Sequence, residues 1–343
     1  MTSCPLPFEP KDTVTMAHGA GGRHTFRLIQ NIFAPAFHLS SSQLSDSAIV
    51  GDEEKWAIST DAHVVSPLFF PGGDIGTLAT NGTCNDLAMV GAEPKWLAVS
   101  WILEEGITFD TLNRISQSLA AAAAQNGATI IAGDTKVVPK GKGDGLYLSS
   151  AGFGLHRMPF IPSPSRLKPG LELIISGDIG RHAIAIASLR DNSIGFSAEI
   201  ASDCCPLWPL VAALLNNSLY PAAMRDCTRG GLATVLAEWA EESNLGMELE
   251  EEAVPLLEPV RAACDLLGFD PLYLACEGRF LLAIEKEKVE DTINLLRQFP
   301  YGKMAARIGR VTNANPGRAV ARQPYGTERI LDRLSGEILP RIC

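Results

Sequence analysis

The last residue of the chain is a cysteine, Cys343, and a thiol at a chain end can be carried to chemistry that a packed thiol would never reach. Upstream of it, Leu334-Ser335-Gly336-Glu337 is typical of a flexible joint. The eight residues from Gly336 onward span roughly 25 Å when extended at about 3.3 Å per residue. We therefore expect a mobile tail over residues 335–343 that reaches a pocket in its own subunit or in another. Taken alone, a terminal cysteine is more often a residue without a role.

Five aspartates are candidate ligands for a metal ion or a nucleotide. Four lie at the ends of apolar runs beside small residues, and the fifth stands between two serines: Asp61, Asp86, Asp134, Asp226 and Asp46. Mg²⁺ takes oxygen ligands from separate segments, and one or two carboxylates with phosphate oxygens and water complete its octahedron. For any one of them, the alternative is a carboxylate that only caps a helix or starts a turn.

Two glycine-rich segments are candidates for the matching phosphate contacts, Gly19-Ala20-Gly21-Gly22 and Gly230-Gly231. A backbone without Cβ atoms can approach a phosphate closely, and a helix N-terminus presents unpaired N–H groups. Neither segment matches the P-loop pattern, and no Gly-x-Gly-x-x-Gly follows a strand. A glycine cluster alone is weak support, because it is more often just a turn.

Composition limits the classes of partner. The chain has 343 residues, 46% of them hydrophobic and 20% charged, which suggests about two domains. A formal net charge of −10 argues against a general nucleic-acid surface, because phosphate backbones are bound mainly by clustered Lys and Arg. The eight cysteines lack zinc spacing. No apolar run reaches the roughly 18 residues of a membrane span and no signal peptide is recognisable, so we expect no membrane association and a cytoplasmic location.

Hydrophobic spacing divides the chain into two units of mixed helices and strands. In the first unit, a helix after Gly22 is expected to kink at Pro35, and a later helix has Thr108 as its N-cap. A proline-rich segment at residues 158–165 can neither pair in a ladder nor continue a helix. We therefore predict an N-terminal domain, a C-terminal α+β domain and the tail, at residues 1–157, 158–334 and 335–343. The strands of the first unit are expected at residues 56–60, 96–103, 128–132 and 146–151.

Several segments, taken together and in this order, resemble the HypE family of hydrogenase maturation factors. They are Ala17-His18-Gly19-Ala20-Gly21-Gly22, Ser59-Thr60-Asp61, Phe69-Phe70-Pro71-Gly72-Gly73, Asn85-Asp86-Leu87, Gly133-Asp134-Thr135-Lys136, Asp226-Cys227-Thr228-Arg229-Gly230-Gly231 and Pro340-Arg341-Ile342-Cys343. The aspartate and glycine segments alone indicate only the wider superfamily of aminoimidazole ribonucleotide synthetase, selenophosphate synthetase and thiamine monophosphate kinase. The Pro-Arg-Ile-Cys terminus and the Phe-Phe-Pro-Gly-Gly segment narrow the resemblance to HypE.

The resemblance implies an α+β fold of two domains like that of aminoimidazole ribonucleotide synthetase, with the N-terminal sheet pairing in a homodimer. It implies that the C-terminal cysteine receives a carbamoyl group from the carbamoyltransferase HypF. ATP with Mg²⁺ then drives dehydration of the S-carbamoyl-cysteine to a thiocyanate. The cyano group is expected to pass to iron on a HypC–HypD complex, for the active site of [NiFe] hydrogenase.

The resemblance also implies site residues. Cys343 is the reactant, Glu277 is the candidate base, and Lys136 steadies an oxyanion or relays protons. The non-catalytic alternatives are that Lys136 is a phosphate contact or a solvated turn residue and that Glu277 caps a loop. The nucleotide is expected to contact Gly19, Gly21, Gly22, Asp61, Asn85, Asp86, Asp134, Asp226, Thr228 and Gly230. The metal ligands are expected among Asp46, Asp61, Asp86, Asp134 and Asp226.

Two other functions remain open at this point. A phosphotransferase like selenophosphate synthetase would be expected to keep a reactive cysteine near the N-terminal glycine segment, where this chain has none. A nucleotide-regulated scaffold would use the apolar tail residues Ile338, Leu339 and Ile342 to dock on a partner. The mass of the tail after incubation with HypF, carbamoyl phosphate and ATP separates an enzyme from a scaffold.

Overall fold

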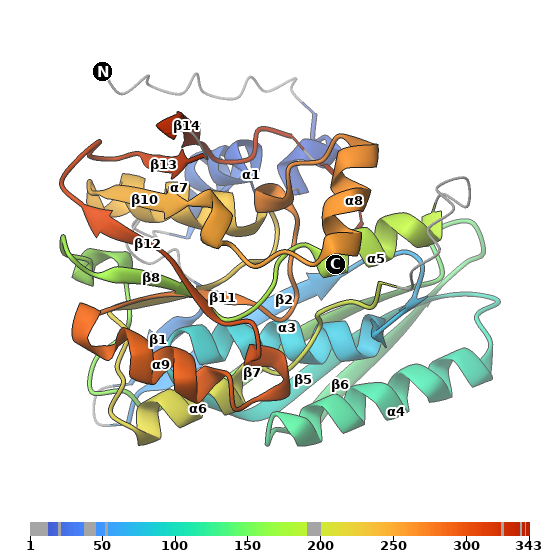
Figure 1. Ribbon diagram of the computed structural model, residues 1–343. Helices are drawn as coiled ribbons and strands as arrows, with labels where there is room; N and C mark the ends of the chain where they lie inside the picture. Colours follow the sequence, from blue (N-terminus) through green and yellow to red (C-terminus); the bar gives the residue numbers. More distant parts are fainter. Residues whose placement is uncertain are drawn as a thin grey trace.

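The computed structural model describes residues 13–19, 22–37, 46–51, 54–190, 200–323, 326–336, 338–339 and 341–343. Each half of the chain forms its own β-sheet with helices packed on it, and the C-terminus lies beside α5 (Arg181–Arg190) (Figure 1). The strands of the first sheet fall between Ala48 and His156, and those of the second between Glu172 and Leu331. The predicted α+β class is confirmed, and the boundary at residues 157 and 158 stays a prediction that falls between the two sheets.

The first sheet is mostly antiparallel, and only β5 and β6 run parallel. In spatial order its strands are β1 (Ala48–Val50), β2 (Trp56–His63), β7 (Leu146–His156), β5 (Ala92–Glu104) and β6 (Thr129–Val138). A short separate ribbon is made by β3 (Phe69–Phe70) and β4 (Gly73–Asp74). Two helices cover one face of the sheet, α3 (Ile75–Met89) and α4 (Phe109–Gln125).

Both covering helices begin at capping residues. Asp74 accepts hydrogen bonds from the backbone of Gly76 and Thr77, and Thr108 accepts one from Thr111. Such a cap satisfies a backbone N–H that has no partner inside the helix and contributes about 1 kcal/mol. The predicted N-cap at Thr108 is confirmed, and the caps fix where α3 and α4 lie on the sheet.

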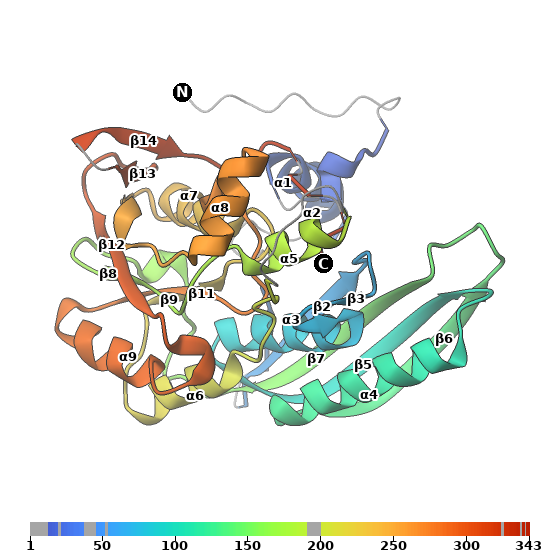
Figure 2. The ribbon, with the colours of Figure 1, turned by 45° about the vertical axis from the view of Figure 1, so that its right-hand side comes forward.

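The opposite face of the first sheet carries exposed apolar side chains. The rings of Trp56 and Trp96 stack there with centroids 5.2 Å apart, and Trp96 is 42% exposed. Farther along β5, Ile102 is 39% exposed, and all of β6 except its last residue is exposed. Figure 2 shows β5, β6 and β7 extending away from the second sheet, with α4 along one side.

The second sheet has helices on both faces. Its strand order is β14 (Glu328–Leu331), β13 (Ala319–Arg322), β10 (Gly246–Glu250), β12 (Ala306–Thr312), β8 (Glu172–Ile175), β11 (Phe280–Ile284) and β9 (Ala223–Asp226). Leu281 packs in the cluster of α7 (Gly231–Ser243), whereas Leu282 packs with α6 (Trp208–Asn216) and α9 (Val289–Leu296). Successive strand residues point to opposite faces, so β11 is buried on both. A further helix, α8 (Glu258–Leu267), packs near α5.

The first helix is irregular near the predicted kink, and one strand runs past its predicted end. The helix after Gly22 is divided into α1 (Arg23–Leu28), a π-helical turn (Ile29–Phe33) and α2 (Ala34–Ala36). The π-helical turn ends two residues before Pro35, which lies in α2 and has no N–H to donate within a helix. The parallel strand β6 continues six residues beyond the predicted end at Ala132. Within the described ranges, no helix is both long enough and apolar enough to cross a membrane.

Candidate active site around the C-terminal cysteine

The end of the tail pairs with the segment that follows β2. The backbone N–H of Val64 donates to the Cys343 carbonyl at 3.1 Å, and that of Ser66 donates to the Arg341 carbonyl at 3.2 Å. This two-residue alternation is that of an antiparallel strand pair. Cys343 is only 7% exposed. The described part of the predicted mobile tail is therefore docked on its own chain in this structure, and movement of the tail between partners stays a prediction.

A buried histidine on α5 holds the backbone of the tail. His182 Nε2 lies 2.7 Å from the Ile342 carbonyl oxygen, and its Nδ1 lies 2.8 Å from Ser202 Oγ. Burial lowers the pKa of His182, although Asp203 acts in the opposite sense, so the ring is neutral. A carbonyl can only accept, so Nε2 carries the proton and donates it to Ile342, while Nδ1 accepts from the serine hydroxyl.

Replacing this histidine should loosen the tail. His182→Phe keeps an aromatic ring but removes the donor to Ile342, and an unsatisfied buried carbonyl costs about 1–3 kcal/mol, so we expect the tail to open roughly tenfold more often. The rate at which iodoacetamide alkylates Cys343, mapped by mass spectrometry, measures this opening. His24→Phe, far from the tail in sequence and half-exposed, is the control. Equal alkylation rates in the parent and His182→Phe proteins would contradict the role.

The sulfur of the tail contacts an arginine. Arg229 Nε donates to Cys343 Sγ at 2.9 Å, and Arg229 Nη1 donates to the Gly19 carbonyl at 2.6 Å. Burial raises the pKa of the Cys343 thiol to about 12 even though Arg229 lowers it, and the carboxylates of Glu277 and Asp61 add to the rise. The docked thiol is therefore protonated at neutral pH and is a poor nucleophile in this position.

Glu277 lies in the same cleft, in the loop before β11. The side chain is 4% exposed, and its Oε1 makes no hydrogen bond within the described residues. Burial and the nearby Asp226 and Asp61 raise the pKa of Glu277 well above its usual range, against a smaller lowering by Arg229. A buried carboxyl group with a raised pKa binds a proton more tightly than an exposed one, which suits a general base or acid.

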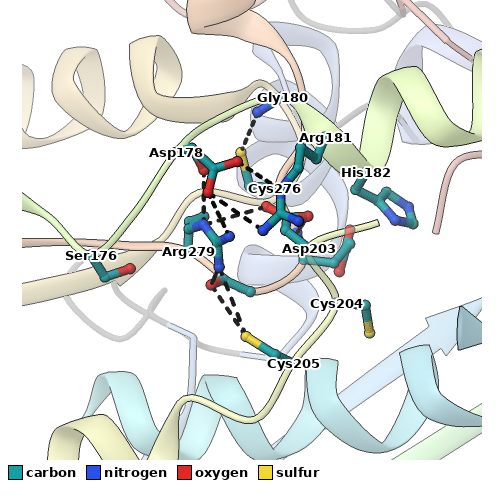
Figure 3. Close-up of polar contacts among 12 residues, drawn as sticks. Ser176, Asp178, Gly180, Arg181, His182, Asp203, Cys204, Cys205, Cys276 and Arg279 are labelled. Carbon is teal, nitrogen blue, oxygen red and sulfur yellow. Dashed lines mark hydrogen bonds and ion pairs between the residues drawn. The ribbon is translucent and has the colours of Figure 1, made fainter. Parts of the chain in front are cut away.

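A buried ion network fixes the loop that carries Glu277. Asp203 Oδ1 accepts from the Glu277 backbone N–H at 3.1 Å, and Asp203 Oδ2 lies 3.9 Å from Arg279 Nε. Arg279 is 1% exposed and also pairs with Asp178 at 2.9 Å (Figure 3). Since breaking a buried ion pair leaves an uncompensated charge, this network holds the Glu277 backbone rigidly.

Three of the predicted metal ligands converge. Oxygen atoms of Asp46, Asp86 and Asp226 all lie within 4.8 Å of one another. Burial, reinforced by the neighbouring carboxylates, raises the pKa of Asp86 well above its usual range and that of Asp226 to about 8. Arg225 neutralises only part of this charge, through an ion pair of 2.8 Å with Asp46. Convergent carboxylates that are largely shielded from solvent and only partly compensated suit a hard divalent cation.

Asp61 lines the same cleft as Asp86, Asp226 and Cys343 but does not belong to the three-carboxylate cluster. Its Oδ2 lies 3.1 Å from His63 Nε2. Burial alone would raise the pKa of Asp61, but the His63 ring and the Arg229 guanidinium lower it to about 2. Asp61 is thus ionised at neutral pH and faces the cation beside Cys343.

Several of the side chains described above line one open cleft. Its volume of about 400 Å³ is within the usual range for a small-molecule site. The cleft lies where the end of β2, helix α3, the β9–α7 loop and the tail meet. Its lining residues include Thr60, Asp61, Gly82, Asp86, Arg225, Asp226, Thr228, Arg229, Glu238, Glu277 and Cys343. Residues from both halves of the chain and from its very end therefore contribute to the same site.

Asp134 and Lys136 do not reach this cleft. Both lie in the exposed strand β6, where Lys136 Nζ pairs with Asp134 at 2.7 Å, and their side chains are 62% and 71% exposed. The expected metal role of Asp134 and catalytic role of Lys136 are thus not met within one chain. The physical reason is that the strand runs on through residues 133–136, where the sequence suggested a turn at a strand end.

Asn85 lies in α3, outside the described residues that line the cleft. Its Oδ1 accepts from the Leu207 backbone at 2.8 Å and its Nδ2 donates to the Cys205 carbonyl at 3.1 Å, so the amide joins α3 to the segment before α6. Both ends of the buried amide are engaged within the chain, and a nucleotide contact by Asn85 stays a prediction.

The predicted glycines fall into different environments. Gly22 packs so closely on the Leu334 carbonyl that a Cβ atom would lie 2.0 Å from its oxygen. Gly230 begins α7 with φ +80°, a conformation that favours glycine. Gly19 accepts the hydrogen bond from Arg229, and Gly21 lies outside the described residues. Gly22 therefore serves packing, and the Gly230 backbone is the candidate that adjoins the cleft.

Comparison with known proteins identifies the family. The N-terminal and C-terminal domain models of AIR synthase related proteins match residues 44–156 and 168–322. The carbamoyl dehydratase HypE of Azotobacter vinelandii is 46% identical over 334 residues, which cover 96% of this chain and 97% of the relative. The chain belongs to the HypE family. Its predicted relation to the AIR synthetase superfamily is thereby confirmed.

Solved structures of HypE proteins share this fold. One, crystallised in a HypE–HypF complex, has a TM-score of 0.84 and 38% identity and covers 90% of this chain and 99% of its own. Another, a HypE in complex with ATP, has a TM-score of 0.81 and 41% identity and covers 96% of this chain and 100% of its own. The two-domain arrangement is therefore that of HypE.

Two residues that touch the tail of this HypE-family chain carried no predicted role. Arg229 lies in the Asp226 to Gly231 segment. A cationic residue three positions after a candidate metal ligand could have indicated a contact with the substrate or the nucleotide. His182 lies in an otherwise apolar helix, where nothing local indicates that the far end of the chain packs against it. A contact separated by 160 residues cannot be inferred from local spacing.

Proposed function

We propose that this protein is an ATP-dependent carbamoyl dehydratase that converts an S-carbamoyl group on its own Cys343 to a thiocyanate, the source of the cyano ligand in [NiFe] hydrogenase maturation. The observation that carries the proposal is that Cys343 lines the same cleft as Glu277 and as Asp86 and Asp226, two members of the three-carboxylate cluster. Membership of the HypE family supports the same reaction.

The chemistry requires an activated oxygen and a base. An amide oxygen is a poor leaving group, so the carbamoyl oxygen attacks the γ-phosphorus of ATP, and the bond from that phosphorus to ADP breaks. The C–O bond then breaks with its electron pair leaving on phosphate, while the nitrogen loses both protons and the nitrile forms. Glu277 is the candidate acceptor for a nitrogen proton, because it is buried, lies in the cleft of Cys343 and has an oxygen that makes no hydrogen bond to the part of the chain that the structure describes.

The nucleotide needs compensation for its charge. Asp46, Asp86 and Asp226 would hold Mg²⁺, which neutralises phosphate oxygens when bound. Thr228, two residues after Asp226, also lines the cleft. Gly230 is the N-cap of helix α7, and a helix N-terminus favours anions. The solved relative with bound ATP supports nucleotide binding by this family.

Carbamoylation belongs to an undocked tail. The docked Cys343 thiol is buried and protonated, so it is unsuited to attack a carbamoyl donor in this position. HypF is the proposed donor enzyme, supported by the relative crystallised with HypF. A HypC–HypD complex is the proposed acceptor of the cyano group. The tail would dock carbamoylated, react, and leave again for the acceptor.

A homodimer accounts for the residues that lie outside the cleft. The uncovered face of the first sheet bears Trp96 and Ile102, and the strand register puts Lys136 beside Ile102. A second copy that covers this face would bury the exposed apolar side chains. Asp134 and Lys136 of one copy would then lie at the cleft of the other copy.

A charge placed on this face should separate the two copies. Trp96→Glu puts a carboxylate in the proposed interface, so we expect a monomer by light scattering. Phe109→Glu is the matched control, because Phe109 is 89% exposed at the start of α4 on the covered side, and it should keep the parent's mass. A Trp96→Glu protein of unchanged dimeric mass, or a monomeric parent, would contradict this interface.

Intact-mass analysis tests the function itself. Incubation with HypF, carbamoyl phosphate and ATP should add one carbamoyl group, after which the protein loses the mass of one water. A scaffold would show neither change, and a phosphotransferase like selenophosphate synthetase would release phosphate without either mass change. A protein that never loses water from a carbamoylated tail would contradict the proposal.

A further inference from the structure

We propose that Arg229 is a catalytic residue of the dehydration, which binds the carbamoyl oxygen on Cys343 and stabilises the phosphate that forms on it. The proposal rests on the proposed function and extends it to a residue with no assigned role. Arg229 reaches the reacting group from the loop between β9 and α7, directly before Gly230.

The contact with sulfur places the guanidinium beside the reacting atoms. Arg229 Nε lies 2.9 Å from Cys343 Sγ. In the carbamoylated protein the carbonyl carbon is bonded to that sulfur and the oxygen is one bond farther, so both remain within reach of the same planar group. A guanidinium offers several donors in a fixed fork, which suits two oxygens of a phosphate or a phosphorylated carbamoyl group.

The acidic lining of the cleft gives a cation at this position a partner for the negative charge of the nucleotide and of the leaving phosphate. The lining includes Asp61, Asp86, Asp226 and Glu277, and ATP adds further negative charge. Arg225 is the second arginine of the lining, but it is engaged by Asp46 at 2.8 Å and by Glu238 at 3.6 Å. Among the described residues that line the cleft, Arg229 is the cation in contact with Cys343.

Arg229 is also held in place before substrate arrives. Its Nη1 donates to the Gly19 carbonyl at 2.6 Å, so the guanidinium bridges the glycine segment and the tail. Such preorganised donors stabilise developing charge without reorganising during the reaction. In the phosphorylation step the carbamoyl oxygen gains a bond to the γ-phosphorus and ADP departs. In the elimination step the electron pair of the C–O bond leaves with phosphate. Arg229 faces the carbamoyl oxygen in both the phosphorylation and the elimination step.

The test uses protein carbamoylated by HypF and then mixed with ATP in a single turnover. Arg229→Gln should accept the carbamoyl group and bind ATP, yet lose water about 10²–10³-fold more slowly, the usual effect of removing one oxyanion donor. Arg229→Lys keeps the charge without the fork and should recover part of the rate. Arg318→Gln, which removes an exposed arginine remote from the cleft, is the control.

The outcomes separate this proposal from the proposed function. If the parent does not lose water under these conditions, the function itself fails. If the parent reacts and Arg229→Gln reacts as fast, only the role of Arg229 is overturned. Thermal unfolding and ATP binding of each variant are measured alongside. If Arg229→Gln does not fold, the rate of water loss by Arg229→Lys decides the role of Arg229. A folded lysine variant with the full parent rate would overturn the role of the guanidinium donors.

Discussion

Cys343→Ala protein should bind ATP as the parent does but acquire no carbamoyl group and form no thiocyanate. The sulfur is the atom that carries the reacting group, whereas the carboxylate cluster for the nucleotide is built from Asp46, Asp86 and Asp226 on other segments. Among the described residues that line the cleft, Cys343 is the one cysteine. The expected effect is therefore complete loss of product, measured by intact mass, with an unchanged ATP affinity.

A second cysteine provides the control for this experiment. Cys204 is half-buried outside the cleft lining, where its sulfur contacts Asn81, so Cys204→Ala should be carbamoylated and dehydrated like the parent. Thiocyanate formation by the Cys343→Ala protein would mean that another nucleophile carries the group. That result would remove the tail from the mechanism.

Glu277→Gln should accept the carbamoyl group normally but dehydrate it about 10²–10⁴-fold more slowly, the usual cost of losing a general base. Glutamine has nearly the shape of glutamate, and the backbone contact from Glu277 to Asp203 does not involve the replaced atoms. The substitution therefore removes the proton acceptor while leaving the loop in place. Rates of water loss in a single turnover measure the effect.

Glu285→Gln is the matched control for this prediction. Glu285 follows β11 at the end remote from Glu277, and its side chain is 49% exposed, so this variant should dehydrate at the parent rate. A Glu277→Gln protein that dehydrates as fast as Glu285→Gln would exclude Glu277 as the base and leave it a role in the loop alone.

Local signals in the sequence predicted local structure well. The cap at Thr108 and the proline at residue 35 mark the start of α4 and the break before α2, because both act through the backbone of their own segment. β6 shows where such signals end. A strand can run on through Gly133 and Asp134 when its neighbour β5 supplies the hydrogen bonds, which neighbouring residues in sequence do not reveal.

The site was only partly predictable for the same reason. Residue type indicated that Asp46, Asp86 and Asp226 could be ligands, but not that these three would converge without Asp61 or Asp134. The resemblance to HypE supplied roles for Glu277 and Cys343 that spacing could not. The contacts of Cys343 with Arg229 and of Ile342 with His182 depend on where the far end of the chain docks.

The central claim is that ATP removes the oxygen of a carbamoyl group carried by Cys343. Protein whose carbamoyl group contains a heavy oxygen isotope, mixed with ordinary ATP, tests it in one turnover by mass spectrometry of the released phosphate. The proposed reaction transfers the heavy oxygen to phosphate, because the C–O–P linkage of the phosphorylated group breaks between carbon and oxygen and the oxygen stays on phosphorus. Unlabelled phosphate, with the heavy oxygen found in water instead, would contradict activation of that oxygen by ATP.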